Sequence, residues 1–116
     1  YTDASKTQNQ VGAAVIFENR TLKFKLPETM SINTAELFAI HKAIQTIMDK
    51  QETYKKYIIY TDSISAIQTI IKIYPKNKNV QQIQQMITEL KHIRNNDVIL
   101  VWIPSHCGIN GNEAAD

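Results

Sequence analysis

Two acidic residues end a repeated tripeptide. Tyr-Thr-Asp occurs at the start of the chain, ending in Asp3, and returns later, ending in Asp62. The apolar run Lys56–Thr61 before the second copy predicts a buried strand, and the first copy indicates the end of another. If these two strands are parallel neighbours, both carboxylates emerge at the same edge of the sheet, where open α/β sheets place their ligand sites.

Two further acids can reach this edge. Glu36 falls in the first turn of a helix expected from Thr34, at the margin of the apolar stripe of that helix. Asp116 lies one turn into another helix, which Asn112 is expected to cap. The sequence therefore predicts four carboxylates in one place.

Four neighbouring carboxylates cannot all stay ionised without a counter-charge, because each negative charge raises the pKa of the others. Divalent metal ions supply that charge. The acids offer only oxygen ligands, and the sequence has no Cys or His cluster at zinc spacing, which favours Mg²⁺ or Mn²⁺. Two such ions about 3.5–4 Å apart can bind the attacking and the leaving oxygen of a phosphodiester. Each acid alone could instead cap a helix or complement its dipole, so the prediction depends on all four.

The first half of the chain predicts an antiparallel unit followed by a helix. Val11–Glu18 is an apolar run of strand character, and Thr21–Leu26 alternates strictly, as in a half-solvated strand. The two residues between them indicate a hairpin turn. The helix is expected from Thr34 to about Lys50, with Asn33 or Thr34 as its cap. Its apolar stripe contains Leu37, Ile40, Ile44, Ile47 and Met48.

The second half predicts parallel crossovers. Lys56–Thr61 and Val98–Ile103 are apolar on both faces, as in buried central strands. Between them we expect one helix capped by Ser63 that ends at Pro75, and a second over Asn79–Arg94. Their inward residues are Ile64, Ile67, Ile71 and Tyr74 in the first helix, and Val80, Ile83, Ile87 and Leu90 in the second. This order predicts an α/β fold, a mixed sheet with helices on its faces.

The composition is that of one globular domain. The chain has 116 residues, of which 43% are hydrophobic and 21% charged, and a net charge of +2 that decides nothing about partners. Its apolar runs are too short to span a bilayer, and no membrane association is expected. The single cysteine, Cys107, excludes an internal disulfide and fits a reducing compartment. Both ends of the sequence interrupt expected elements, so residues 1–116 are interpreted as one domain truncated at both ends.

Four motifs, in this order and at these intervals, resemble the type 1 ribonuclease H domain: YTDAS, NTAEL, YTDS and VWIPSHCGINGNEAAD. The similarity covers essentially the whole chain. It is closest to the versions carried by the reverse transcriptases of non-LTR retrotransposons. The resemblance implies a five-stranded mixed sheet in the order 3-2-1-4-5, flanked by helices, which agrees with the element order expected above.

The resemblance also implies which residues form the site. The four acids that bind metal and act in catalysis in the family correspond to Asp3, Glu36, Asp62 and Asp116. The histidine of the family's mobile loop corresponds to His106, with a catalytic role in proton transfer or product release. Nucleic-acid contacts are implied for Asn33, which matches a position that reads the minor groove, and for the backbone near Ala4 and Ser5.

Family members hydrolyse the RNA strand of RNA–DNA hybrids with two Mg²⁺ ions, for which Mn²⁺ can substitute. The resemblance thus implies an endonuclease that acts on RNA–DNA hybrid and shares its polypeptide with a reverse transcriptase domain. An intracellular location follows from that context, in the cytoplasm or the nucleus.

The sequence departs from the family at two places. Many members have Gln where this chain has Ile64, and the cellular enzymes have a basic loop containing Trp where this chain has only Tyr74–Asn79. The isolated domain is therefore expected to bind hybrid weakly. Trp102 is assigned to core packing. The alternative functions are a catalytically inactive nucleic-acid-binding remnant of the same fold and a related nuclease or integrase, against which the SHCGINGNEAAD segment argues.

Overall fold

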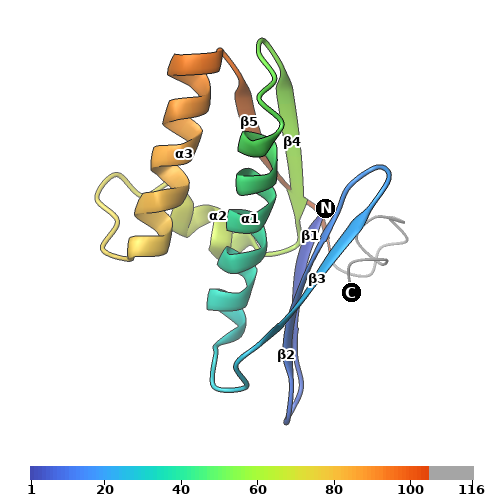
Figure 1. Cartoon of the computed structure of the whole chain (residues 1–116). Coiled ribbons are helices and arrows are strands. Elements are labelled where there is room, and N and C mark those ends of the chain that lie inside the picture. Colours follow the sequence, from blue (N-terminus) through green and yellow to red (C-terminus); the bar gives the residue numbers. More distant parts are fainter. Residues whose placement is uncertain (105–116) are drawn as a thin grey trace.

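The computed structural model describes residues 1–104 and shows a mixed sheet with helices packed on it (Figure 1). The elements in chain order are β1 Thr2–Lys6, β2 Val11–Ile16, β3 Thr21–Leu26, α1 Ile32–Asp49, β4 Lys56–Thr61, α2 Ile64–Ile70, α3 Lys78–Arg94 and β5 Asp97–Trp102. The strand order is β3-β2-β1-β4-β5. β1 pairs antiparallel with β2 and parallel with β4, while β2–β3 is antiparallel and β4–β5 parallel. The predicted fold class and strand order are confirmed.

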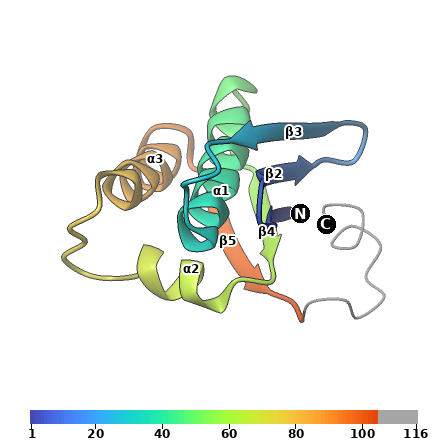
Figure 2. The ribbon, with the colours of Figure 1, turned by 90° about the horizontal axis from the view of Figure 1, so that it is seen from below.

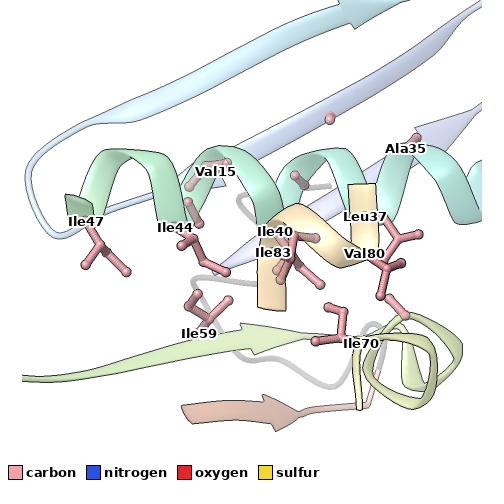
Figure 3. Packing of buried hydrophobic residues seen from close by; sticks show 14 of the residues in the cluster. Val15, Ala35, Leu37, Ile40, Ile44, Ile47, Ile59, Ile70, Val80 and Ile83 are labelled. Atoms are coloured by element: carbon pink, nitrogen blue, oxygen red, sulfur yellow. The ribbon is translucent and has the colours of Figure 1, made fainter. Parts of the chain in front are cut away.

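The apolar stripe of α1 forms the centre of the core. Ile40 and Ile44 are fully buried, and α1 packs on β1, β2 and α3 (Figures 2 and 3). Val15 of β2 and Ile83 of α3 meet this stripe from either side. None of the helices within residues 1–104 is long and apolar enough to cross a membrane.

The cap of α1 differs from the expectation. The N-cap is Ser31, whose Oγ accepts a hydrogen bond from the backbone N–H of Thr34 at 3.1 Å; it is neither Asn33 nor Thr34. Ser31 has the extended backbone that a cap requires, with φ −71° and ψ 156°, whereas Asn33 and Thr34 already lie in the helix. As a result Glu36 belongs to the second turn of α1 and not to the first.

The expectation that β4 and β5 are buried on both faces is wrong. Ile58 is 47% exposed, and its partner in the parallel register, Ile99, is 39% exposed. The alternate residue Ile59 is buried in the core. The reason is that, in the described part of the chain, α1 and α3 lie on the same side of the sheet (Figure 2). The other face of these two strands therefore keeps contact with solvent.

The helix after β4 is shorter than its apolar spacing suggested. Ser63 caps α2 as expected, with its Oγ accepting from the N–H of Ala66 at 3.2 Å, but the helix ends at Ile70. Its buried residues are Ala66 and Ile70, while Tyr74, counted in the expected stripe, is 90% exposed. The apolar residues keep their helical spacing in the sequence after Ile70, but the backbone there is no longer helical. In α3, by contrast, the expected inward residues Val80, Ile83 and Leu90 are buried.

The loop before β4 is held by one buried side chain, that of Asn96. Its Oδ1 accepts from the N–H of Lys55 and its Nδ2 donates to the carbonyl of Glu52, both at 2.8 Å. Gln51 and Tyr54 in this loop have a left-handed backbone conformation, with φ 56° and 57°. Residues other than glycine rarely adopt this conformation. The hydrogen bonds of Asn96 compensate this strain and join the start of β4 to that of β5.

Asn96→Ala should lower the free energy of unfolding by about 2–3 kcal/mol, because it leaves two polar backbone groups without partners. Urea unfolding followed by circular dichroism measures the effect. The matched control is Asn9→Ala, which removes an exposed asparagine and should change stability by less than about 0.5 kcal/mol. Equal stability of the two variants would contradict the role assigned to Asn96.

Candidate metal centre

Asp3 directly follows Thr2, the residue of β1 that pairs with the last residue of β4. The two strands are parallel neighbours, as predicted, but their ladder contains one pair in this structure, Thr2 with Thr61. β1 does not end at Asp3, as expected from the sequence; it continues to Lys6 in its ladder with β2. Beyond the last pair with β4, β1 has no neighbour on that side among the described strands. Asp3 is 1% exposed at the opening of this gap.

Glu36 reaches the same place from α1. This helix packs directly on β1, and Glu36 is 5% exposed on its inner side. Its carboxylate also accepts a hydrogen bond from the backbone of Ala4, the residue that follows Asp3. α1 therefore supplies an acid that approaches β1 from the helical layer.

Asp62 occupies the turn between β4 and α2 and is half-buried. The turn is fixed on both sides of this residue: the N–H of Ile103 donates to the carbonyl of Thr61 at 2.9 Å, and the N–H of Ser63 donates to Thr61 Oγ1 at 3.1 Å. Thr61 itself is fully buried. The end of β4 thus presents Asp62 at a defined position beside β1.

Three of the four predicted acids come together. Asp3, Glu36 and Asp62 each offer one carboxylate oxygen, and these oxygens lie within 4.8 Å of one another. The fourth acid, Asp116, and the histidine His106 lie outside the described residues. The structure therefore brings together acids from two strands and one helix.

Burial makes this cluster electrostatically unfavourable. Loss of solvation first, and then the negative charge of Asp62, raise the pKa of Glu36 to about 8, while the hydrogen bond from Ala4 lowers it. Asp3 Oδ2 and Glu36 Oε2 are buried and accept no hydrogen bond within residues 1–104. No Lys or Arg of the same residues forms an ion pair with Asp3 or Glu36. A buried acceptor without a partner is costly, so these two oxygens require a cation or a proton.

The donor set fits a hard divalent cation. Carboxylate oxygens are the ligands that Mg²⁺ and Mn²⁺ prefer, and two of the three acids in the cluster, Asp3 and Glu36, each carry a buried oxygen without a partner within residues 1–104. Asp3, Glu36 and Asp62 could each contribute one oxygen.

The candidate nucleic-acid residues border the cluster. Ser5 and Asn33 are exposed and Ala4 is partly buried. The Oγ of Ser65 in α2 donates to Asn33 Oδ1 at 3.2 Å, which turns the amide nitrogen of Asn33 away from Ser65. Ser65 was missed in the sequence analysis. The one signal in the sequence was that Ser65 lies three residues after Asp62, and this does not reveal its contact with Asn33.

Trp102 was also missed, and its assignment to the core is wrong. Its side chain is 48% exposed, and its Nε1–H donates to the backbone carbonyl of Asp62 at 3.1 Å. The register pairs Trp102 with Thr61, so the indole lies beside the turn that carries the acid. The alternation of β5 alone could not show that this position lies at the rim.

Comparison with known proteins agrees with the fold. The family model described as RNase H matches residues 1–116. RNase H1 from the halophilic archaeon Halobacterium salinarum NRC-1 is similar over 99% of this chain and 90% of its own, with TM-score 0.65 and 14% identity. The N-terminal RNase H domain of a Mycobacterium tuberculosis protein, solved as a fusion with maltose-binding protein, matches 98% of this chain and 91% of its own, with TM-score 0.65 and 13% identity.

A third solved structure is that of LC11-RNase H1, a protein isolated from compost by a metagenomic approach, in complex with an RNA/DNA hybrid. It is 18% identical, with TM-score 0.67, over 97% of this chain and 89% of its own. At such identities the structures show a shared fold, and the family model shows the relationship. The chain therefore belongs to the RNase H family, and the expectation of a ribonuclease H enzyme is confirmed.

Proposed function

We propose that this domain is an endonuclease that hydrolyses the RNA strand of RNA–DNA hybrids by a two-metal-ion mechanism. Asp3, Glu36 and Asp62 would hold the cations, with Asp116 as the fourth ligand expected from the sequence. Bound divalent ions supply Lewis acidity and positive charge at the phosphodiester, where charge develops during hydrolysis. His106, ten positions before Asp116, is the candidate for proton transfer.

The observation that supports this proposal is the pair of buried carboxylate oxygens without partners. Asp3 and Glu36 belong to different elements, yet both are part of the same cluster and each has a buried oxygen without a hydrogen bond within residues 1–104. A side chain that caps a helix accepts a hydrogen bond from a backbone N–H of the first turn, as the hydroxyls of Ser31 and Ser63 do in this chain. A metal site explains the convergence of these carboxylates, whereas capping does not.

Recognition of the hybrid would use the groups that border the cluster. Distinguishing RNA from DNA requires contact with the 2′-hydroxyl in the minor groove. The amide of Asn33, oriented by Ser65, is the candidate for this contact. Ser5 and the backbone at Ala4, which follow Asp3 in β1, would bind the RNA strand near the cleaved bond. A solved structure of the LC11 enzyme holds an RNA/DNA hybrid, which supports the same substrate class here.

We further propose that the domain works within a reverse transcriptase polypeptide of a retroelement. The motifs are closest to those of non-LTR retrotransposons, and residues 71–77 between α2 and α3 form a short loop rather than a basic, Trp-containing one. A domain with few cationic contacts gains affinity when it is linked to a polymerase that already holds the nucleic acid. The catalytically inactive remnant stays as the alternative, and loss of metal binding would favour it.

Asp62→Asn should reduce cleavage of the RNA strand in a labelled RNA–DNA hybrid by at least about 100-fold in the presence of Mg²⁺, because it removes a negative ligand from the cluster. Gel electrophoresis of the products measures the rate. The matched control is Asp49→Asn at the exposed end of α1, which should leave the rate unchanged. Equal cutting of duplex DNA, or full activity of Asp62→Asn, would refute the assignment.

Glu36 makes the stability of the metal-free protein depend on pH. Its pKa is raised from 4.5 to about 8, so the folded state retains a proton that the unfolded state has released. Stability should therefore fall as the pH rises from about 5 to 8, by an amount on the order of a few kcal/mol. Glu36→Gln carries no charge at any pH and should be the more stable protein at pH 8. Thermal unfolding in EDTA across this range measures the difference.

Mg²⁺ should reverse much of this pH dependence in the wild type, because a bound cation favours the ionised carboxylate, and should have less effect on Glu36→Gln. The control is Glu18→Gln, an exposed carboxylate whose removal should leave the pH dependence of the wild type intact. A flat stability profile for the metal-free wild type would show that the cluster does not hold the proton.

A further inference from the structure

The carbonyl oxygen of Asp62 is the acceptor of a side-chain hydrogen bond that comes from a different strand. Trp102 is the last residue of β5, and its Nε1–H lies 3.1 Å from that oxygen. In the parallel ladder Trp102 faces Thr61, and the N–H of Ile103 donates to the Thr61 carbonyl at 2.9 Å. Trp102 and the residue after it therefore bind two successive carbonyls, that of the last residue of β4 and that of Asp62.

Simple core packing does not explain this contact. A tryptophan that served the core would remove most of its surface from water, but Trp102 remains 48% exposed. Val98 and Leu100, which precede it at alternate positions of β5, pack against the core as expected. The part of Trp102 that is specifically engaged is its single polar group, and that group contacts the backbone of an acid in the cluster.

Asp62 depends on such a contact more than the other two acids do. Asp3 lies within a strand and Glu36 within a helix of 18 residues, so regular backbone hydrogen bonds fix both. Asp62 lies between two elements, where its carbonyl belongs to no ladder. The direction of its Cα–Cβ bond depends on the orientation of the next peptide, whose N–H donates to Thr61 Oγ1 and whose carbonyl accepts from Trp102.

We propose that Trp102 is a positioning residue for the metal site: its indole N–H fixes the peptide after Asp62 and thereby aligns the Asp62 carboxylate with Asp3 and Glu36. This inference rests on the proposed function of the cluster. In this proposal Trp102 is not itself a ligand of the cation and acts through the backbone of Asp62. Its hydrogen bond reduces the number of orientations that the Asp62 carboxylate can adopt before a cation binds. The site is therefore better preorganised for binding.

Trp102→Phe tests the proposal, since it keeps an aromatic ring and removes the N–H. Isothermal titration with Mn²⁺ in the absence of nucleic acid should show metal affinity reduced about five-fold, the effect of one neutral hydrogen bond. In cleavage assays at fixed, subsaturating Mg²⁺, kcat should fall by a similar factor with KM for the hybrid unchanged, and higher Mg²⁺ should restore kcat.

The matched control is Tyr57→Phe. It removes an aromatic hydrogen bond of another β-strand, from the Tyr57 hydroxyl to Glu52 Oε1 at 2.8 Å, at the end of β4 that is distant from Asp62. A purely structural role for Trp102 would make both variants alike, with lower melting temperatures and wild-type affinity for Mn²⁺ in the folded protein. That result would overturn the proposal while leaving the proposed function intact.

A second measurement needs no substitution at Trp102 and decides the matter if Trp102→Phe fails to fold. Trp102 is the sole tryptophan of the 116 residues, so selectively excited emission reports on this position alone. Titration of the wild type with Mg²⁺ should shift or quench this emission, and Asp62→Asn should abolish the response. Emission that does not change while calorimetry shows bound metal would overturn the proposal. Absence of any metal binding by the wild type would instead refute the proposed function.

Discussion

The structure of this domain depends on three carboxylates, those of Asp3 and Glu36 buried and that of Asp62 half-buried, each of which offers one oxygen within 4.8 Å of the others. The arrangement is unfavourable by itself, since desolvation and mutual repulsion raise the pKa of Glu36 to about 8 and two oxygens have no partner within residues 1–104. It persists because the elements that carry the acids are fixed by interactions elsewhere. β1 is held by its ladder with β2, α1 by a buried apolar stripe, and β4 by its ladder with β5. The stable core thus supports a strained site at its edge.

The change of direction at β1 creates the place for this site. β1 has an antiparallel neighbour on one side and a parallel neighbour on the other, and the parallel ladder stops at Thr2 and Thr61. Beyond that pair β4 has ended and β1 continues without a described strand on that side, so a side chain from the helical layer can approach the acid on β1. Glu36 occupies this approach. Ligand sites in open α/β sheets lie at such switch points because the diverging strand ends leave a crevice.

Periodicity predicted those features that depend on local sequence. The alternation in Thr21–Leu26 and the apolar run Lys56–Thr61 matched the strands β3 and β4 residue for residue. The repeated tripeptide correctly predicted that β1 and β4 are parallel neighbours. The failures concern information that is not local. Ile58 is exposed because its burial depends on which segments cover that face of the sheet, and the sequence of a strand does not carry this information. Ser31, Asn33 and Thr34 are all good caps, and only the backbone conformation selects Ser31.

The three acids also differ in how their positions are secured, and this difference bears on function. Asp3 and Glu36 are nearly inaccessible and belong to regular elements, whereas Asp62 is half-buried in a turn. If the cluster binds metal as proposed, Asp3 and Glu36 form its fixed inner side and Asp62 its outer side, toward the substrate. A ligand in a turn can adjust when substrate and product exchange, but it then needs a restraint to recover its position. The indole N–H of Trp102 is such a restraint, because a single neutral hydrogen bond at the partly exposed rim can open and close at low cost.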